Sequence, residues 1–168
     1  MLIIGEKRFK QGDWINIDGV AEGEVEKIDF RSTLIRRFDK APIFVPNSVL
    51  SDSEIINFSE MPFRRIRFNV GLIYQTTPET ILNIRKDIED YVAKNDDLVN
   101  ADEATTTIRV TQLNDYSIDL LIYCFTKSTR WYDFTKAKED LILEIIRIVK
   151  NNGSDFAYPT QTIHLEKD

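Results

Sequence analysis

Few residues of this 168-residue chain have the chemistry that catalysis or metal binding requires. His164 is the only histidine, so a catalytic triad, a dyad or a histidine-based metal site would have to include it. It lies four residues from the end of the sequence on a predicted strand, which favours an outward-facing or interface residue over a catalytic base. The sequence contains no C-x-x-C, H-E-x-x-H, G-x-G-x-x-G or P-loop motif. We therefore predict that the chain is not an enzyme and has no catalytic residue, cofactor or metal.

One cysteine and one acidic cluster also invite a chemical interpretation. Cys124 lies inside the apolar run 120–125, which favours a small buried hydrophobe over a nucleophile or ligand. A lone cysteine cannot form an internal disulfide. The acidic pairs at 96–97 and 102–103 resemble a cation site, but the glycine and the alternating ligand spacing of a calcium loop are missing. We predict a buried thiol and a solvated loop.

The one concentration of positive charge consists of six arginines, and it allows two interpretations. The first is contact with phosphate or RNA, since small bent β-barrels can bind nucleic acid. The second is that the arginines line a water-filled interior or pair with acids of neighbouring subunits. The formal net charge of −6 and the scarcity of aromatic residues among them favour the second, so no nucleic-acid partner is expected. These residues are Arg31, Arg36, Arg37, Arg64, Arg65 and Arg67.

Length and composition indicate a soluble globular protein of one domain or two small ones. Apolar residues make up 42% and charged residues 30% of the chain, which is ordinary for this class. The longest apolar runs, such as 120–125, are far shorter than the ~20 residues that a membrane-spanning helix needs. The first residues are too short an apolar stretch for a signal peptide. We therefore expect this chain to be soluble.

Residues 9–60 have the pattern of a compact all-β unit. Asp18-Gly19 is a turn, and Gly23 tolerates a bend or a close neighbour. At Pro46-Asn47-Ser48 the apolar run stops, and we expect Asn47 to cap a helical turn over 49–51. The five expected strands are 14–17, 23–28, 33–36, 43–45 and 55–57. So small a sheet keeps exposed edges, and a neighbouring subunit is one way to cover them.

The following residues predict an α/β sandwich. Strict alternation over 65–72 indicates a half-buried strand, and Thr77-Pro78 is a helix start with threonine as N-cap. A strand over 106–111 and a central strand over 116–125 follow. The last helix begins near the aromatic cluster 131–134, which we interpret as a packing anchor, and Gly153 is positioned as its C-terminal cap. The order βαββα is most of a ferredoxin-like sandwich that lacks its fourth strand.

Short ordered motifs recur along the chain. They are Phe9 to Ile15 (FKQGDWI), Gly-x-Val-Glu at 23–26, RST-x-IR at 31–36, VPNS at 45–48, IIN at 55–57 and FAYPTQT at 156–162. Together they resemble the small-conductance mechanosensitive channel family, over nearly the whole chain. Within the central stretch the matching residues are Arg31, Ser32, Thr33, Ile35, Arg36, Val45, Pro46, Asn47, Ser48, Ile55, Ile56 and Asn57.

The resemblance implies an α+β fold: a small five-stranded Sm-like β domain, a ferredoxin-like α/β domain, and a C-terminal strand for an oligomeric β-barrel. The expected divisions are 1–8 as the stub of the pore-lining helix, 9–60, 61–154 and 155–168. An expression tag or a frayed terminus would look the same as that stub. The assembly strand comprises Pro159, Thr160, Gln161, Thr162, Ile163, His164 and Leu165.

The function that the resemblance implies is the vestibule of a channel that opens under membrane tension and releases ions and small solutes in hypo-osmotic shock. The expected assembly is a homo-oligomer, a heptamer in the full-length channel, on the cytoplasmic side of the inner membrane. Contact with the bilayer would run through the missing transmembrane helices, so this chain scaffolds and filters but cannot conduct. Candidate residues lining the portals or vestibule are Asn57, Glu60, Arg64, Arg65 and Arg67.

Two further interpretations of the chain stay open. It is either an excised part of a channel or a natural stand-alone homologue. As a stand-alone binding module it would hold RNA or a small ligand on the β domain.

Overall fold

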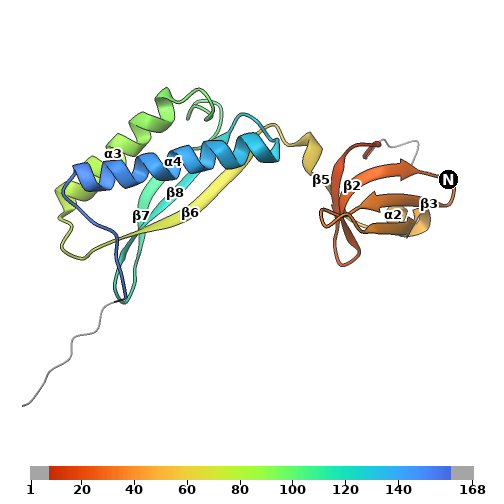
Figure 1. Ribbon diagram of the computed structural model, residues 1–168, viewed down its shortest axis with the longest axis horizontal. Coiled ribbons are helices and arrows are strands. Elements are labelled where there is room, and N and C mark those ends of the chain that lie inside the picture. The colour runs from red at the N-terminus through yellow and green to blue at the C-terminus, as the bar shows by residue number, and fades with distance from the viewer. Residues whose placement is uncertain (1–7, 160–168) are drawn as a thin grey trace, which may run out of the picture. The chain divides into compact units, whose positions relative to one another are not determined.

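The computed structural model describes residues 8–159, and the chain divides into two compact units between Met61 and Pro62. Each unit has its own hydrophobic core, and Figure 1 labels most of the elements of both. Within 8–159, no helix is both long and apolar enough to cross a membrane. Sheets and helices lie in both units, which confirms the predicted α+β class.

The first unit, here called the β unit, is a five-stranded antiparallel sheet in the order β4-β3-β2-β1-β5. A short helix α2 (Asn47–Asp52) follows β4, and a single 3-10 turn η1 (Phe58–Glu60) follows β5. All five predicted strands are present. Their bounds are β1 (Trp14–Ile17), β2 (Ala21–Ile28), β3 (Ser32–Arg36), β4 (Pro42–Pro46) and β5 (Ile55–Asn57). Short turns join β1 to β4 in succession, and after α2 the chain returns as β5 to the outer side of β1.

Alternation along the strands builds the core of the β unit. Ile15, Ile17, Val25 and Ile35 are at most 1% exposed, since every second residue of a strand faces the same side. Gly23 lies where β2 approaches β3: a Cβ built there would be 2.3 Å from the carbonyl oxygen of Arg36. The close neighbour predicted for this glycine is therefore confirmed. A register shift between Val25 and Lys27 follows it and bends the sheet.

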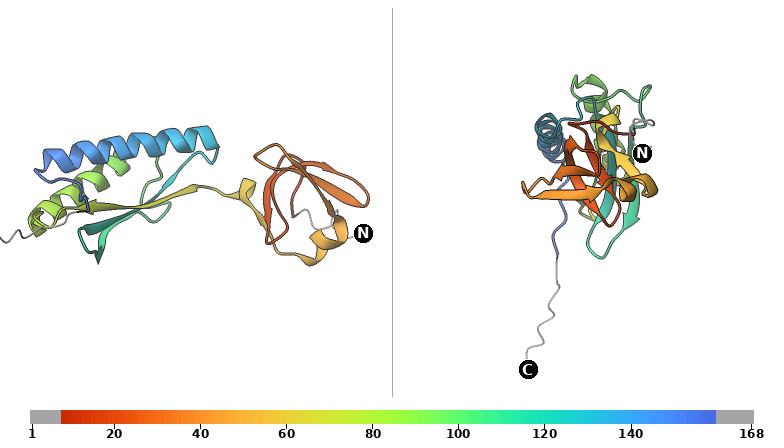
Figure 2. Two further views of the ribbon diagram at one scale, coloured as in Figure 1. Left: turned by 60° about the horizontal axis from the view of Figure 1, so that its bottom comes forward. Right: turned by 90° about the vertical axis from the view of Figure 1, so that its right-hand side faces the viewer.

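The second unit, here called the α/β unit, has a three-stranded antiparallel sheet in the order β6-β8-β7. Helices α3 and α4 both lie on one face of this sheet (Figure 2). The bounds are β6 (Arg64–Leu72), α3 (Pro78–Lys94), β7 (Thr107–Leu113), β8 (Ile118–Thr126) and α4 (Trp131–Asn151). The predicted central position of β8 is confirmed, and its residues Leu120, Ile122 and Cys124 are fully buried beneath the helices.

Local signals in the sequence fix the ends of both helices. The Thr77 hydroxyl accepts a hydrogen bond from the backbone N–H of Thr80, so it caps α3 as predicted. Gly153 follows α4 with φ +72°, a conformation that suits glycine at a helix end. Both helices then present their apolar stripes, which include Ile84, Ile88 and Leu141, to the sheet.

The fourth strand of a ferredoxin-like sheet is reduced to one bridge, between Phe156 and Leu72. The N–H of Ala157 donates to the carbonyl of Gly71 at 2.9 Å. In antiparallel register the next inward N–H would belong to Pro159, opposite Asn69, and proline has none. Within residues 8–159 this edge therefore has a single bridge, which the N-substituted Pro159 cannot extend. Backbone hydrogen bonds tie residues 155–157 to the α/β unit.

Candidate functional site

The Pro46-Asn47-Ser48 turn starts helix α2, but Asn47 does not cap it. Pro46 occupies the N-cap position, and no side chain bonds to the free N–H groups of the first turn. The prediction that Asn47 is the cap is therefore wrong. Because Asn47 is already the first helical residue, its side chain is free to reach the neighbouring β2–β3 turn.

The Asn47 amide connects three segments that lie far apart in the sequence. Its Oδ1 accepts a hydrogen bond from the Thr33 hydroxyl at 2.9 Å, and its Nδ2 donates to the carbonyls of Asp29 at 2.9 Å and Phe30 at 3.2 Å. Thr33 is fully buried, so its hydroxyl needs this partner. In the backbone, the N–H of Asn47 also donates to the carbonyl of Arg31. Thr33 of the RST motif and Asn47 of the VPNS motif thus belong to one hydrogen-bond network, here called the Asn47 joint.

A second polar joint involves Asn57, one of the candidate portal residues. Its Nδ2 donates to Asp13 Oδ2 at 2.8 Å and to the carbonyl of Arg8 at 3.2 Å, while its Oδ1 accepts from the N–H of Ser59. Asp13 is only 3% exposed and also accepts from the N–H of Lys10. The amide of Asn57 is therefore engaged within the β unit. Sequence reasoning missed the role of Asp13, which stands in the FKQGDWI motif.

Two arginines of the β unit, Arg36 and Arg37, are paired with acids of the same unit. Arg36 forms a two-point contact with Glu26, with nitrogen–oxygen distances of 2.5 and 2.9 Å. This hydrogen bonding holds the pKa of the exposed Glu26 carboxyl below its usual value. Arg37 lies 3.1 Å from Asp39. These two guanidinium groups are therefore engaged within the β unit.

Arg64 is stacked on aromatic rings at the start of α4. Its guanidinium carbon lies 4.8 Å from the centre of the Trp131 ring and 4.5 Å from that of Phe134. Partial burial lowers the pKa of Arg64. In the predicted packing anchor, Phe134 contacts the core, whereas Trp131 and Tyr132 are 66% and 73% exposed.

The outer edges of the β unit carry large exposed side chains. Phe44 on edge strand β4 is 67% exposed, and Ile56 on edge strand β5 is 55% exposed. Phe30, in the β2–β3 turn, is 84% exposed. An unpaired strand edge with a large apolar side chain is typical of a surface that another chain covers.

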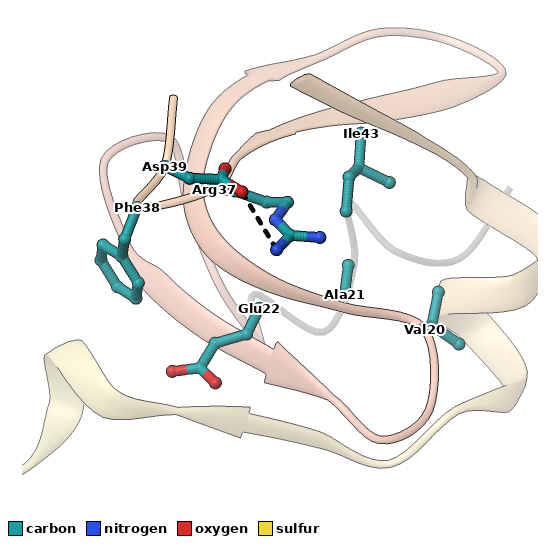
Figure 3. Close-up of a pocket in the computed structure, with 7 residues that line it drawn as sticks. All are labelled: Val20, Ala21, Glu22, Arg37, Phe38, Asp39 and Ile43. Atoms are coloured by element: carbon teal, nitrogen blue, oxygen red, sulfur yellow. Dashed lines mark ion pairs between the residues drawn. The ribbon is translucent and has the colours of Figure 1, made fainter. Parts of the chain in front are cut away.

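The β unit also contains a pocket of about 320 Å³ between its β1–β2 and β3–β4 turns (Figure 3). The ion pair of Arg37 with Asp39 lies at its wall, and Phe38 packs edge-to-face on Trp14 with ring centres 5.4 Å apart. The pocket holds no cysteine, histidine or hydroxyl that could act as a nucleophile. Its lining residues are Val20, Ala21, Glu22, Arg37, Phe38, Asp39 and Ile43.

Residues 8–159 contain no group of three or more histidine, cysteine, aspartate or glutamate side chains placed to hold a metal ion. Cys124 is buried as predicted, and burial raises the pKa of its thiol to about 12. The terminal residues 160–168, which include His164, lie outside the described part of the chain.

The β unit thus has side-chain hydrogen bonds that connect its segments, and large apolar side chains exposed on its two edge strands. Residues 1–60 match the family model of the mechanosensitive ion channel β-domain, and residues 66–156 match that of the C-terminal region of the mechanosensitive ion channel MscS. The chain belongs to the MscS family of mechanosensitive ion channels.

Named relatives agree with this assignment. The chain is 34% identical over 167 residues to the low conductance mechanosensitive channel YnaI of Escherichia coli. The aligned region covers 99% of this chain and 48% of YnaI. It is 33% identical over 168 residues to the small-conductance channel MscMJ of Methanocaldococcus jannaschii, covering 100% of this chain and 47% of that channel. The chain therefore spans about half the length of these relatives.

Solved structures show the same fold. The crystal structure of Helicobacter pylori MscS in its closed state superposes with a TM-score of 0.78 at 26% identity, covering 99% of this chain and 63% of that one. Arabidopsis thaliana MSL1 superposes with a TM-score of 0.84 at 23% identity, covering 94% of this chain and 56% of that one.

The Asn47 joint makes a stability prediction. We expect Asn47→Ala to lower the free energy of unfolding of the β unit by ~1–3 kcal/mol, because the buried Thr33 hydroxyl loses its acceptor. Ser48→Ala is the matched control, since Ser48 is exposed and should change stability by less than ~0.5 kcal/mol. Urea unfolding followed by Trp14 fluorescence in a Trp131→Phe background reports on the β unit alone. Equal stability of the two variants would contradict the structural role of Asn47.

Proposed function

We propose that this chain forms the vestibule of a tension-gated channel, on the cytoplasmic side of the inner membrane. In this role it scaffolds the pore and filters the ions and small solutes that leave in hypo-osmotic shock. Family membership and the two free sheet edges of the β unit support the proposal. The edges are the observation that carries it, because a vestibule must be built from several copies.

Ring formation would follow from pairing of β4 in one copy with β5 in the next. Such head-to-tail contacts use two different surfaces of one subunit and close into a ring when the rotation between copies allows it. Phe44 and Ile56 would become buried, and each would contribute ~1.5–3 kcal/mol per contact. A heptamer is the ring that we expect in the full-length channel.

Filtering would depend on charges that face the water-filled interior. Fixed charge at the wall of an aqueous passage changes the local concentration of ions. Glu60, Arg65 and Arg67 are exposed, which supports a place at a portal or along the vestibule. Asn57 and Arg64 are engaged within their own units, so we assign them to shaping the wall rather than to contact with ions.

The terminal segment 159–165 would supply one strand per copy to an oligomeric barrel. Pro159 supports this proposal, because it has no N–H with which to extend the pairing of 155–157 with β6. A barrel closed by identical strands leaves no free edge.

The proposed pairing of β4 with β5 of the next copy predicts how charged substitutions on these strands change the oligomeric state. We expect the wild-type chain to form a closed ring, and Phe44→Glu or Ile56→Lys alone to give monomers, because a charge would be buried at each contact. The double variant should recover part of the assembly, since opposite charges then face each other across the strands. Leu82→Glu, on α3 and 53% exposed, is the control. Light scattering over a concentration series measures the masses. A ring that persists in both single variants would overturn the edge contact.

The barrel strand predicts the effect of a deletion. Removing residues 160–165 should weaken the ring and increase the fraction of smaller species at low concentration, because strand pairing between copies is lost. Removing only residues 166–168 is the matched control and should leave the mass unchanged. The same light-scattering series reads out both deletions. An unchanged ring after the longer deletion would disprove the assembly role.

The vestibule function predicts the behaviour of a chimera. We expect YnaI in which the matching 48% is replaced by this chain to carry tension-activated current in membrane patches. The same chimera with Phe44→Glu should carry none, because its vestibule cannot close. Current in both chimeras would show that ring formation by β4 and β5 is dispensable.

A further inference from the structure

The sheet of the α/β unit has one face that neither helix covers (Figure 2). From Leu120 to Thr126 of the central strand β8, residues alternate between burial and partial exposure, the partly exposed ones lying on this second face. Leu121, Tyr123 and Phe125 are the partly exposed members. The rings of Tyr123 and Phe125 meet edge-to-face, with centres 5.4 Å apart and planes at 84°. This face therefore presents two adjoining aromatic rings.

Two arginines flank these rings on the neighbouring strand β6. The antiparallel register places Arg65 opposite Phe125 and Arg67 opposite Tyr123. Residues directly opposite in an antiparallel pair have Cβ atoms about 4.5–5.5 Å apart and point to the same face. Each of the two aromatic residues thus has an arginine as its direct cross-strand neighbour.

Arg65 and Arg67 differ from most other arginines of the chain because they are exposed and make no hydrogen bond or ion pair within residues 8–159. Arg36 and Arg109, by contrast, are paired with Glu26 and Glu89. Two unpaired like charges on one strand face raise the local positive potential. An anion bound between them would relieve their mutual repulsion and could accept hydrogen bonds from both guanidinium groups.

We propose that this face, composed of Arg65, Arg67, Tyr123 and Phe125, binds a mononucleotide. The base would stack on an exposed part of the aromatic pair, and the phosphate would lie between the two guanidinium groups. Aromatic side chains on the central strands of a sandwich sheet are a recurrent platform for bases, and arginine forks match phosphate geometry. Inorganic phosphate or an acidic peptide would leave the rings unused.

The negative net charge of the chain favours a mononucleotide over an RNA strand as the ligand. Binding along a phosphate backbone depends on many basic side chains, whereas this chain has a formal net charge of −6 and only two free arginines on the face. The site lies within one α/β unit, so it does not depend on ring formation. It would add a ligand-binding activity to the proposed vestibule.

Nuclear magnetic resonance titration of the ¹⁵N-labelled chain with adenosine 5′-monophosphate tests the proposal. We expect saturable shifts confined to residues of β6 and β8, and weaker binding of adenosine and of ribose 5-phosphate. Arg65→Gln/Arg67→Gln should weaken binding at least tenfold, which corresponds to about 1.4 kcal/mol. Arg147→Gln on α4 is the matched control, because Arg147 is exposed on the other side of the sheet. It should bind like the wild type.

The double variant Tyr123→Leu/Phe125→Leu tests the aromatic pair separately. It should weaken the binding of the nucleotide but not the binding of ribose 5-phosphate. Should this variant unfold, the arginine variant still decides, since exposed substitutions leave the fold intact. Absence of saturable binding at millimolar nucleotide, or ribose 5-phosphate binding as tightly as the nucleotide, would overturn the proposal. Tighter, strongly salt-dependent binding of an oligoribonucleotide would overturn the mononucleotide in favour of RNA. Retention of binding by the Phe44→Glu monomer would separate this site from the vestibule proposal.

Discussion

An antiparallel sheet that does not close on itself must leave two strand edges with unpaired N–H and C=O groups, and both units of this chain meet that constraint. In the β unit the open edges belong to β4 and β5, which lie at opposite ends of the strand order. In the α/β unit the pairing of β6 with 155–157 ends after one bridge, where Pro159 has no N–H to continue it. The backbone of each unit is therefore satisfied inside and incomplete outside. In the proposed ring, strands of neighbouring copies would supply the missing hydrogen-bond partners.

Side-chain hydrogen bonds fix the segments next to the two edge strands of the β unit. Asn47 ties the start of α2 to the β2–β3 turn, and Asn57 ties β5 to Asp13 at the entrance to β1. Each amide uses both its donor and its acceptor, so neither joint leaves a buried polar group without a partner. Both edge strands, β4 and β5, thus border a turn that side-chain hydrogen bonds keep in place. A precise edge is what an interface between identical copies requires.

Sequence patterns predicted most of this architecture because they report on local physics. Alternation over 65–72, the Thr77-Pro78 helix start and the glycine at 23 were each confirmed. The role of Asn47 was predicted wrongly, since an asparagine beside a helix start can cap it or reach elsewhere. Its partner Thr33 is 14 residues away, beyond any local signal. The same reason hides the bond between Asp13 and Asn57 and the pairing of Arg36 with Glu26.

The arginines show how one residue type serves different purposes. Arg36 is held in a two-point contact with Glu26, so its field is largely cancelled at short range, whereas Arg65 and Arg67 keep theirs. At physiological ionic strength exposed charges act over ~8 Å, and beyond that they are screened. An ion in a wide aqueous vestibule therefore senses only the unpaired charges that it passes closely. The face that could filter such ions is then the same face that could hold a phosphate, and a bound nucleotide would largely neutralise the positive charge that passing ions meet, since its phosphate carries about −1.5 to −2 at pH 7.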